Sequence, residues 1–234
     1  MKRLATPRNI PKMVTIALAI AIFVLLILHF WSYSYTLSNN LSTENWYFRK
    51  LNFGEEKNAP SVFSTLLYVI ISVLLFKIAT SNLAIKKHNV FWISLGVIFL
   101  FLGADELLRI HEKIGGAFSD NVETSGIFYY SWVIPYGIAL IILGIFIVKP
   151  LFSLPRRTLI SFISAGTIFI IGAVGFEMMG GWYIDNHIID HSTMYKSRPV
   201  FILYTIEELL EMIGLSAFIY ALLRFQEKYI IPRP

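Results

Sequence analysis

Seven carboxylates lie inside or at the ends of segments that are otherwise strongly apolar. They are Asp105, Glu106, Glu112, Glu177, Glu207, Glu208 and Glu211. An ionised side chain at the centre of a bilayer costs about 2.5–3.5 kcal/mol on insertion scales. Because only Arg109, His111 and Lys113 accompany these acids, most of the charge must be neutralised by protons, a metal ion or a cationic ligand. We therefore take the cluster to mark the functional site.

Helical spacing groups the acids of the last apolar segment. Glu207 and Glu211 are neighbours at i and i+4, with Glu208 beside them. Gly214 follows one turn later, so a partner helix can approach closely there. Glu177 lies near the end of the preceding apolar segment, and the topology brings it to the same side. We predict that Glu177, Glu207 and Glu211 are the catalytic residues.

The acids after residue 104 have a different pattern. If the helix continues through this stretch, Asp105, Arg109 and Glu112 fall on one face at 100° per residue. Glu106 then lies to one side, and His111 points mostly away from Asp105. We expect Asp105 and Glu112 to face the acids of the last segment.

Histidines near the acids indicate a metal ion as one way to neutralise them. His187 and His191 share a face if their segment is helical, as many metal-binding pairs do. Carboxylates and imidazoles without thiolates suit zinc, manganese or iron, although the Glu-x-x-His pairs of di-iron bundles are absent. The predicted metal ligands are Asp105, Glu112, Glu177, Glu207, Glu208, Glu211, His111, His187 and His191. They could instead be solvated acids and ordinary loop histidines.

The composition predicts an all-α integral membrane protein. The chain has 234 residues, of which 56% are hydrophobic and 15% charged, and it has no cysteine. Six stretches are long enough to cross a hydrocarbon core, which takes about 20 helical residues. They run approximately over residues 13–31, 61–79, 90–108, 127–148, 158–179 and 200–223. We expect one transmembrane domain over residues 1–234, with Pro135 kinking the fourth span.

Lysine and arginine predict the orientation. They concentrate at the N-terminus, in the loops near residues 77–87 and 149–157, and after the last span. With six spans, all four regions lie on one side, which the positive-inside rule makes cytoplasmic. Both termini are then cytoplasmic and the acids face the other side. The formal charge of +5 reflects this topology, so we expect lipid as a partner and no nucleic acid.

The acidic segments also show a resemblance. Asp105-Glu106 followed by His111-Glu112, and Glu207-Glu208 followed by Glu211-Met212, resemble strings in uncharacterised bacterial multipass membrane proteins. The resemblance covers parts of the third and sixth spans. It implies a location in a bacterial inner (plasma) membrane, and no activity.

Three functions fit these observations. The first is a metal-dependent enzyme that acts on a lipid or small amphiphile from the outer face. The second is a proton- or cation-coupled carrier, since intramembrane acids commonly serve that role. The third is a non-catalytic subunit that binds a cationic partner. The histidines and the one-sided cluster favour the enzyme.

Overall fold

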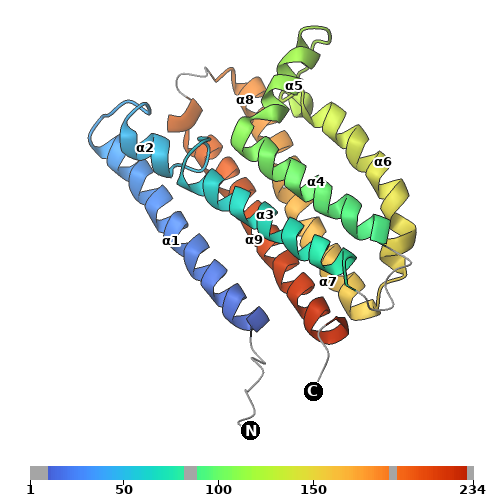
Figure 1. Ribbon diagram of the computed structural model, residues 1–234. Helices are drawn as coiled ribbons and strands as arrows, with labels where there is room; N and C mark the ends of the chain where they lie inside the picture. The colour runs from blue at the N-terminus through green and yellow to red at the C-terminus, as the bar shows by residue number, and fades with distance from the viewer. Residues whose placement is uncertain (1–9, 82–88, 190–193, 231–234) are drawn as a thin grey trace.

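Long helices account for most of the protein. The computed structural model describes residues 10–81, 89–189 and 194–230, and the regular elements in these ranges are all helical (Figure 1). The long helices are α1 (Ile10–Ser38), α3 (Ala59–Ala79), α4 (Asn89–Leu108), α6 (Val133–Phe152), α7 (Arg156–Ile170) and α9 (Arg198–Tyr229). The π-helical turn η3 (Ile171–Phe176) and α8 (Glu177–His187) continue α7 without a break. The short elements are α2 (Trp46–Leu51), α5 (Ile110–Ser119), η2 (Gly126–Phe128) and η4 (Met194–Lys196).

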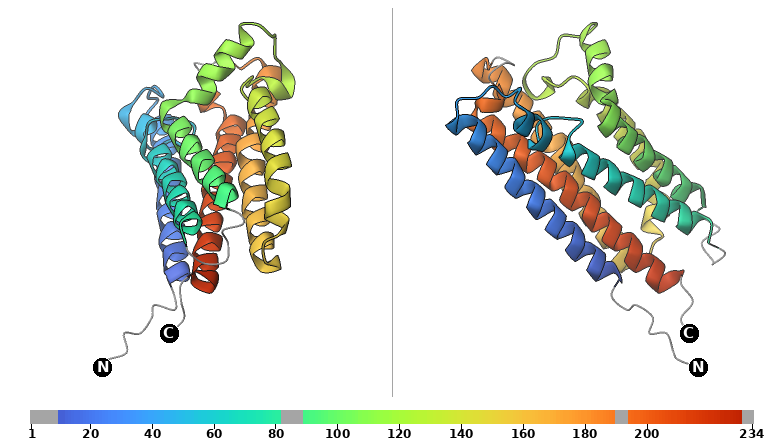
Figure 2. Two further views of the ribbon diagram at one scale, coloured as in Figure 1. Left: turned by 45° about the vertical axis from the view of Figure 1, so that its right-hand side comes forward. Right: turned by 60° about the vertical axis from the view of Figure 1, so that its left-hand side comes forward.

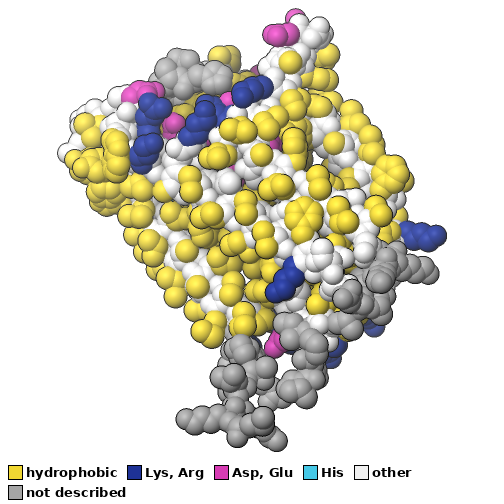
Figure 3. Space-filling view, viewed as in Figure 1, with side chains coloured by type: hydrophobic (Ala, Val, Ile, Leu, Met, Phe, Trp, Pro, Cys, Tyr) yellow, Lys and Arg dark blue, Asp and Glu magenta, His cyan; other side chains and the backbone are white. Residues whose placement is uncertain are grey.

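Five of these helical segments are long and apolar enough to cross a membrane: α1, α3, α4, α6 and the continuous stretch Arg156–His187. The sixth long helix, α9, has 32 residues, but three glutamates interrupt its apolar run: Glu207, Glu208 and Glu211. Apolar side chains cover the flank of the bundle, while Lys and Arg gather toward its two ends (Figure 3). In the most apolar 18-residue stretch of α1, only 11% is buried within the protein, and in that of α6 only 6%. The class indicated is a membrane protein.

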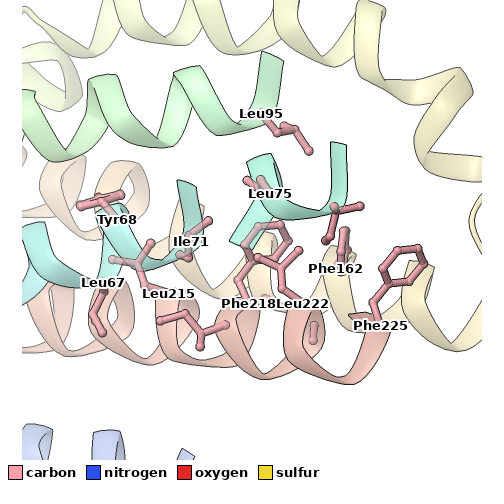
Figure 4. Packing of buried hydrophobic residues seen from close by; sticks show 14 of the residues in the cluster. Leu67, Tyr68, Ile71, Leu75, Leu95, Phe162, Leu215, Phe218, Leu222 and Phe225 are labelled. Atoms are coloured by element: carbon pink, nitrogen blue, oxygen red, sulfur yellow. The ribbon is translucent and has the colours of Figure 1, made fainter. Parts of the chain in front are cut away.

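Helix α9 forms the centre of the packing, with α1, α3 and α7 against it and α4 against α3. The core between them is made of large apolar side chains, shown in Figure 4. Leu67, Ile71 and Leu75 of α3 are completely buried, and so is Leu222 of α9. These residues recur at helical spacing, so each helix buries one stripe.

Two glycines allow α9 to lie unusually close to the preceding helix. A Cβ atom on Gly172 would lie 2.8 Å from the carbonyl oxygen of Glu207. A Cβ atom on Gly214 would lie 2.7 Å from the backbone nitrogen of Phe169. The close approach expected at Gly214 is thus confirmed. Together the two contacts fix the position of Glu207 relative to η3.

The two ends of the bundle differ. Helix α1 begins and α9 ends at the same end, while α2, α5 and the end of α8 lie at the other (Figures 1 and 2). Helix α6 lies at the periphery, and Val133 is its one buried residue. The expected kink at Pro135 is wrong, because α6 begins at Val133 and proline in a first turn breaks no helical hydrogen bond.

Candidate functional site

A large cavity opens at the end of the bundle that carries α2 and α5. Its volume is about 1560 Å³, larger than the 300–1,000 Å³ or so of most ligand pockets. Residues from α3, α4, α6, η3 and α9 line it. All seven carboxylates singled out from the sequence lie on its wall: Asp105, Glu106, Glu112, Glu177, Glu207, Glu208 and Glu211. The structure therefore brings them together, although it does not by itself assign them a catalytic or metal-binding role.

Five of these acids form a deep cluster: Glu106, Glu177, Glu207, Glu208 and Glu211. In the described part of the chain, none of them has a Lys, Arg or His nitrogen within 4.0 Å. Burial and mutual repulsion both disfavour the charged form of neighbouring carboxyl groups. Without a bound cation, the five acids of the deep cluster therefore cannot all be ionised.

Neutral donors complete part of the deep cluster. The indole Nε1 of Trp132 donates to Glu177 Oε1 at 3.0 Å. The hydroxyl of Tyr68 donates to Glu211 Oε2 at 3.4 Å. Gly103 of α4 leaves room for Tyr68, since a Cβ atom there would lie 2.9 Å from the Cβ of Tyr68. These donors orient the carboxyl groups without cancelling their charge.

The π-helical turn η3 sets the position of Glu177. It inserts its wider turn immediately before Glu177, which is the first residue of α8. Such turns are rare and occur often at functional sites. The extra residue rotates everything after it, and Gly172 within the turn contacts Glu207 of α9. Glu177 thereby faces Glu207.

The helix is interrupted between α4 and α5, and this corrects the expectation that it continues through residues 105–112. Arg109 has φ 57° and ψ 48°, the left-handed conformation, so the helix does not continue through residues 105–112. As a result, His111 turns back toward Asp105, and the expectation that it points away is wrong. Its backbone N–H donates to Asp105 Oδ1 at 2.6 Å, and its Nδ1 lies 3.2 Å from the same oxygen. Tyr136 donates to the other oxygen at 2.9 Å.

The rim of the cavity is rich in ion pairs. Arg109 pairs with both Glu56 and Glu112, and His111 Nε2 lies 3.4 Å from Glu56 Oε1. Burial alone would lower the pKa of His111, but the hydrogen bonds to Asp105 and Glu56 outweigh it and raise the pKa to about 10. His111 is therefore a cation at neutral pH. The acids of the rim are thus paired with cations, in contrast to those of the deep cluster.

One group of side chains has the spacing of metal ligands. In residues 10–81, 89–189 and 194–230, only Glu56, His111 and Glu112 place three ligand atoms within 4.8 Å of one another. Arg109 already pairs with both of these glutamates, so a metal ion would have to displace it. No three of the deep acids bring ligand atoms this close together.

Of the other two predicted histidine ligands, His187 does not line the cavity. His187 is the last residue of α8. Its side chain is exposed, and its ring stacks on Tyr183 at 4.1 Å. Ile188 then takes the left-handed conformation, which ends the helix. His191 lies outside the described residues, so the structure does not pair it with His187.

Sequence reasoning missed Glu56, Tyr68 and Trp132. Glu56 follows Glu55 in a loop on the predicted side of the cluster, and that acidic pair was the available signal. The loop is held by His29, which is completely buried. The N–H of Phe53 donates to His29 Nδ1 at 3.0 Å, so Nε2 carries the proton and donates to Thr205 at 2.8 Å. No local sequence pattern predicts contacts between residues that are so far apart in the chain.

One side of the cavity is apolar and open. Phe101 and Leu102 of α4 line it together with Leu140 and Leu143 of α6. Phe101 is 44% exposed and Leu140 is 39% exposed, so this wall faces the surroundings of the bundle as well as the cavity. Helices α4 and α6 make few contacts with each other. The cavity thus joins an acidic interior to an apolar flank.

The fold and the site define an all-helical protein of membrane type with an acidic, side-opening cavity. The chain belongs to the family described as a domain of unknown function, DUF8692, which matches residues 15–225. This range includes every acid of the deep cluster. No curated protein and no solved structure matches the chain.

Proposed function

We propose that this is an integral membrane protein whose acidic cavity binds an amphiphilic organic cation. It crosses the membrane six times, with α9 as the sixth span and both termini in the cytoplasm. The support is the even number of long helices, together with the basic residues at the end where α1 begins. In a bacterium this would be the plasma membrane. The cavity then opens away from the cytoplasm.

The absence of cationic partners for the deep cluster carries the proposal. The described residues provide no ion pair for these five acids, and they lie in a cavity far larger than an inorganic ion needs. Aromatic rings share the wall, among them Tyr68, Trp132 and Tyr204. Carboxylates and aromatic faces together are the surroundings that an organic ammonium group prefers.

The route into the cavity supports an amphiphile. The apolar wall between α4 and α6 lies at the depth of the bilayer, so an acyl chain can remain in contact with lipid while the head group enters. Membrane proteins keep charged groups in cavities of this kind. A small hydrophilic cation would gain nothing from this wall. The ligand class is therefore a cation with an apolar tail.

Protons balance the charge in the empty cavity. Like charges crowded in a low-dielectric cavity cannot all ionise, so the deep cluster holds protons that a bound cation replaces. Exchange of a cation for protons is the elementary step of a coupled carrier. In this account Glu177, Glu207 and Glu211 act as binding and proton-exchange residues.

A head-group series tests the proposal. Protein in nanodiscs of zwitterionic lipid is titrated with three dodecyl compounds that carry a trimethylammonium, a neutral or a sulfate head. We expect the cation to bind at least about tenfold more tightly than the neutral compound, a difference of about 1.4 kcal/mol. Glu207→Gln should remove most of this preference. Glu123→Gln removes the same charge from an exposed loop at the same end and should leave the preference intact.

Two outcomes would overturn the proposal. One is equal binding of the cationic and neutral compounds. The other is an equal loss of preference in Glu123→Gln, which would show that net charge and not the cavity attracts the cation.

A metal-dependent enzyme is the second candidate, favoured by the spacing of Glu56, His111 and Glu112. A divalent ion there could generate a hydroxide nucleophile at the rim, next to a lipid or small amphiphile in the cavity. Elemental analysis of purified protein separates the two candidates. Stoichiometric zinc, manganese or iron that is lost in His111→Asn would favour the enzyme.

A further inference from the structure

A second, smaller cavity lies at the opposite end of the bundle, between the start of α7 and the end of α9. Its volume is about 200 Å³. Its charged side chains are all cations: Arg157, Arg224 and Lys228. No residue of the acidic cavity takes part in it. Its charge is thus opposite to that of the first cavity.

The start of α7 adds backbone donors to this cavity. Helix α7 begins at Arg156 after Pro155, and no side chain caps it. The first backbone N–H groups of a helix have no partner within the helix, and they form the positive end of its dipole. Such an end binds phosphate readily when the ligand can approach it. Arg157 and Thr158, in this first turn, line the cavity.

Thr158 gives the strongest indication that this cavity binds a ligand. Its side chain lines the cavity although the residue is only 8% exposed. Within the described parts of the chain, its hydroxyl has no hydrogen-bond partner. Nearby Ser161 donates to the Arg157 carbonyl at 3.0 Å. The hydroxyl is therefore free to donate to an oxygen of a ligand in the cavity.

The basic side chains of this cavity are also available to bind an anion. Arg157 has no ion pair in residues 10–81, 89–189 and 194–230. Lys228 lies 5.0 Å from the ring centroid of Tyr229. Arg224 shares its charge with Glu227 through Nη1 at 2.9 Å. The net charge of these four side chains is positive, so an anion completes the site.

We propose that this cavity binds the phosphate group of an anionic phospholipid. The inference rests on the membrane placement proposed above and is independent of cation binding at the other end. On that placement the cavity lies at the cytoplasmic boundary, where basic pockets between helices meet lipid head groups. Ala221 and Phe225 supply its apolar side, against which the start of an acyl chain can lie. Free phosphate shares the same chemistry.

Native mass spectrometry of the purified chain in a non-ionic detergent tests this site. The probes are a phosphatidylglycerol, a phosphatidylcholine of the same chains, and inorganic phosphate as a competitor. We expect one phosphatidylglycerol to bind per chain in preference to phosphatidylcholine. Arg157→Ala should weaken that binding about fivefold, the usual effect of losing one cation near an anionic surface. Thr158→Val, which keeps the shape, should also weaken it.

Arg156→Ala is the matched control, because Arg156 lies in the same turn, is exposed, and does not line the cavity. It should leave phosphatidylglycerol binding unchanged. An equal loss in Arg156→Ala, or no loss in both Arg157→Ala and Thr158→Val, would overturn the site. Displacement of the lipid by millimolar phosphate would identify the free anion as the ligand and overturn the lipid proposal. A normal head-group preference at the acidic cavity in the same variants would show that only this inference has failed.

Discussion

Gly172→Ala tests whether the crossing of η3 and α9 positions the acids. The added Cβ would lie 2.8 Å from the Glu207 oxygen, 2.9 Å from the Leu210 Cβ and 3.0 Å from the Glu211 nitrogen. Ordinary contacts begin at 3.4 Å, so α9 must retreat by about 0.6 Å, the difference between 3.4 and 2.8 Å. Two of the three atoms are backbone and cannot rotate away.

The size of the effect follows from two opposing contributions. Overpacking of this kind costs about 1–3 kcal/mol. The better helix propensity of alanine offsets up to about 1 kcal/mol of this cost. We therefore expect a net loss of stability of about 1–2 kcal/mol, measured by thermal unfolding in a mild detergent. We also expect weaker binding of the cationic amphiphile, since Glu207 moves relative to Glu177.

Gly166→Ala is the control for this prediction. Gly166 lies in α7, and a Cβ there meets nothing within 4 Å. This variant should be as stable as the wild type or more stable by up to about 1 kcal/mol. The reasoning would be refuted if Gly172→Ala matched Gly166→Ala in both stability and cation binding.

Three further predictions concern the support of the site. His29→Ala should cost about 2–4 kcal/mol in thermal unfolding, because it leaves the buried N–H of Phe53 unpaired and opens a cavity; a loss under about 1 kcal/mol would show that the loop is held elsewhere. Ile188→Gly should stabilise by about 1 kcal/mol, since an isoleucine at φ 49° is strained and glycine is not; a lower unfolding midpoint would contradict this. The raised pKa of His111, about 10, means that its ion pairs stabilise the fold fully below its ordinary value of 6.5 and are lost as the pH rises through 10. Unfolding midpoints should therefore fall between pH 7 and 10 in the wild type and be flatter in His111→Asn, and equal slopes in the two proteins would exclude His111 as the source.

The general class of fold could be predicted from the sequence. A long apolar segment in lipid must satisfy its own backbone hydrogen bonds, which a helix does. The all-helical class therefore followed from composition. Glu207, Glu208 and Glu211 of α9 were recognisable because they interrupt such a run. Their convergence with Glu177 and Asp105 also followed, since antiparallel spans bring alternate ends to one side.

Other features of the site depend on contacts that local patterns do not encode. The left-handed Arg109 is one, because arginine carries no turn signal, and it reversed the direction of His111. The π-helical turn before Glu177 is another, because its sequence is ordinary apolar helix. Glu56 reaches the rim through the anchor at His29, which joins residues far apart in the chain. Each of these is decided by tertiary packing.

The most direct test of the central claim is the number of protons released when a cationic amphiphile binds. Titration calorimetry with dodecyltrimethylammonium, repeated in buffers of different ionisation enthalpy, gives this number. We expect about one proton released per bound cation at pH 7, and clearly less in Glu177→Gln, because a bound cation replaces protons held by the deep cluster and this variant has one acid fewer. Binding without proton release in the wild type, or equal release in the variant, would contradict the account.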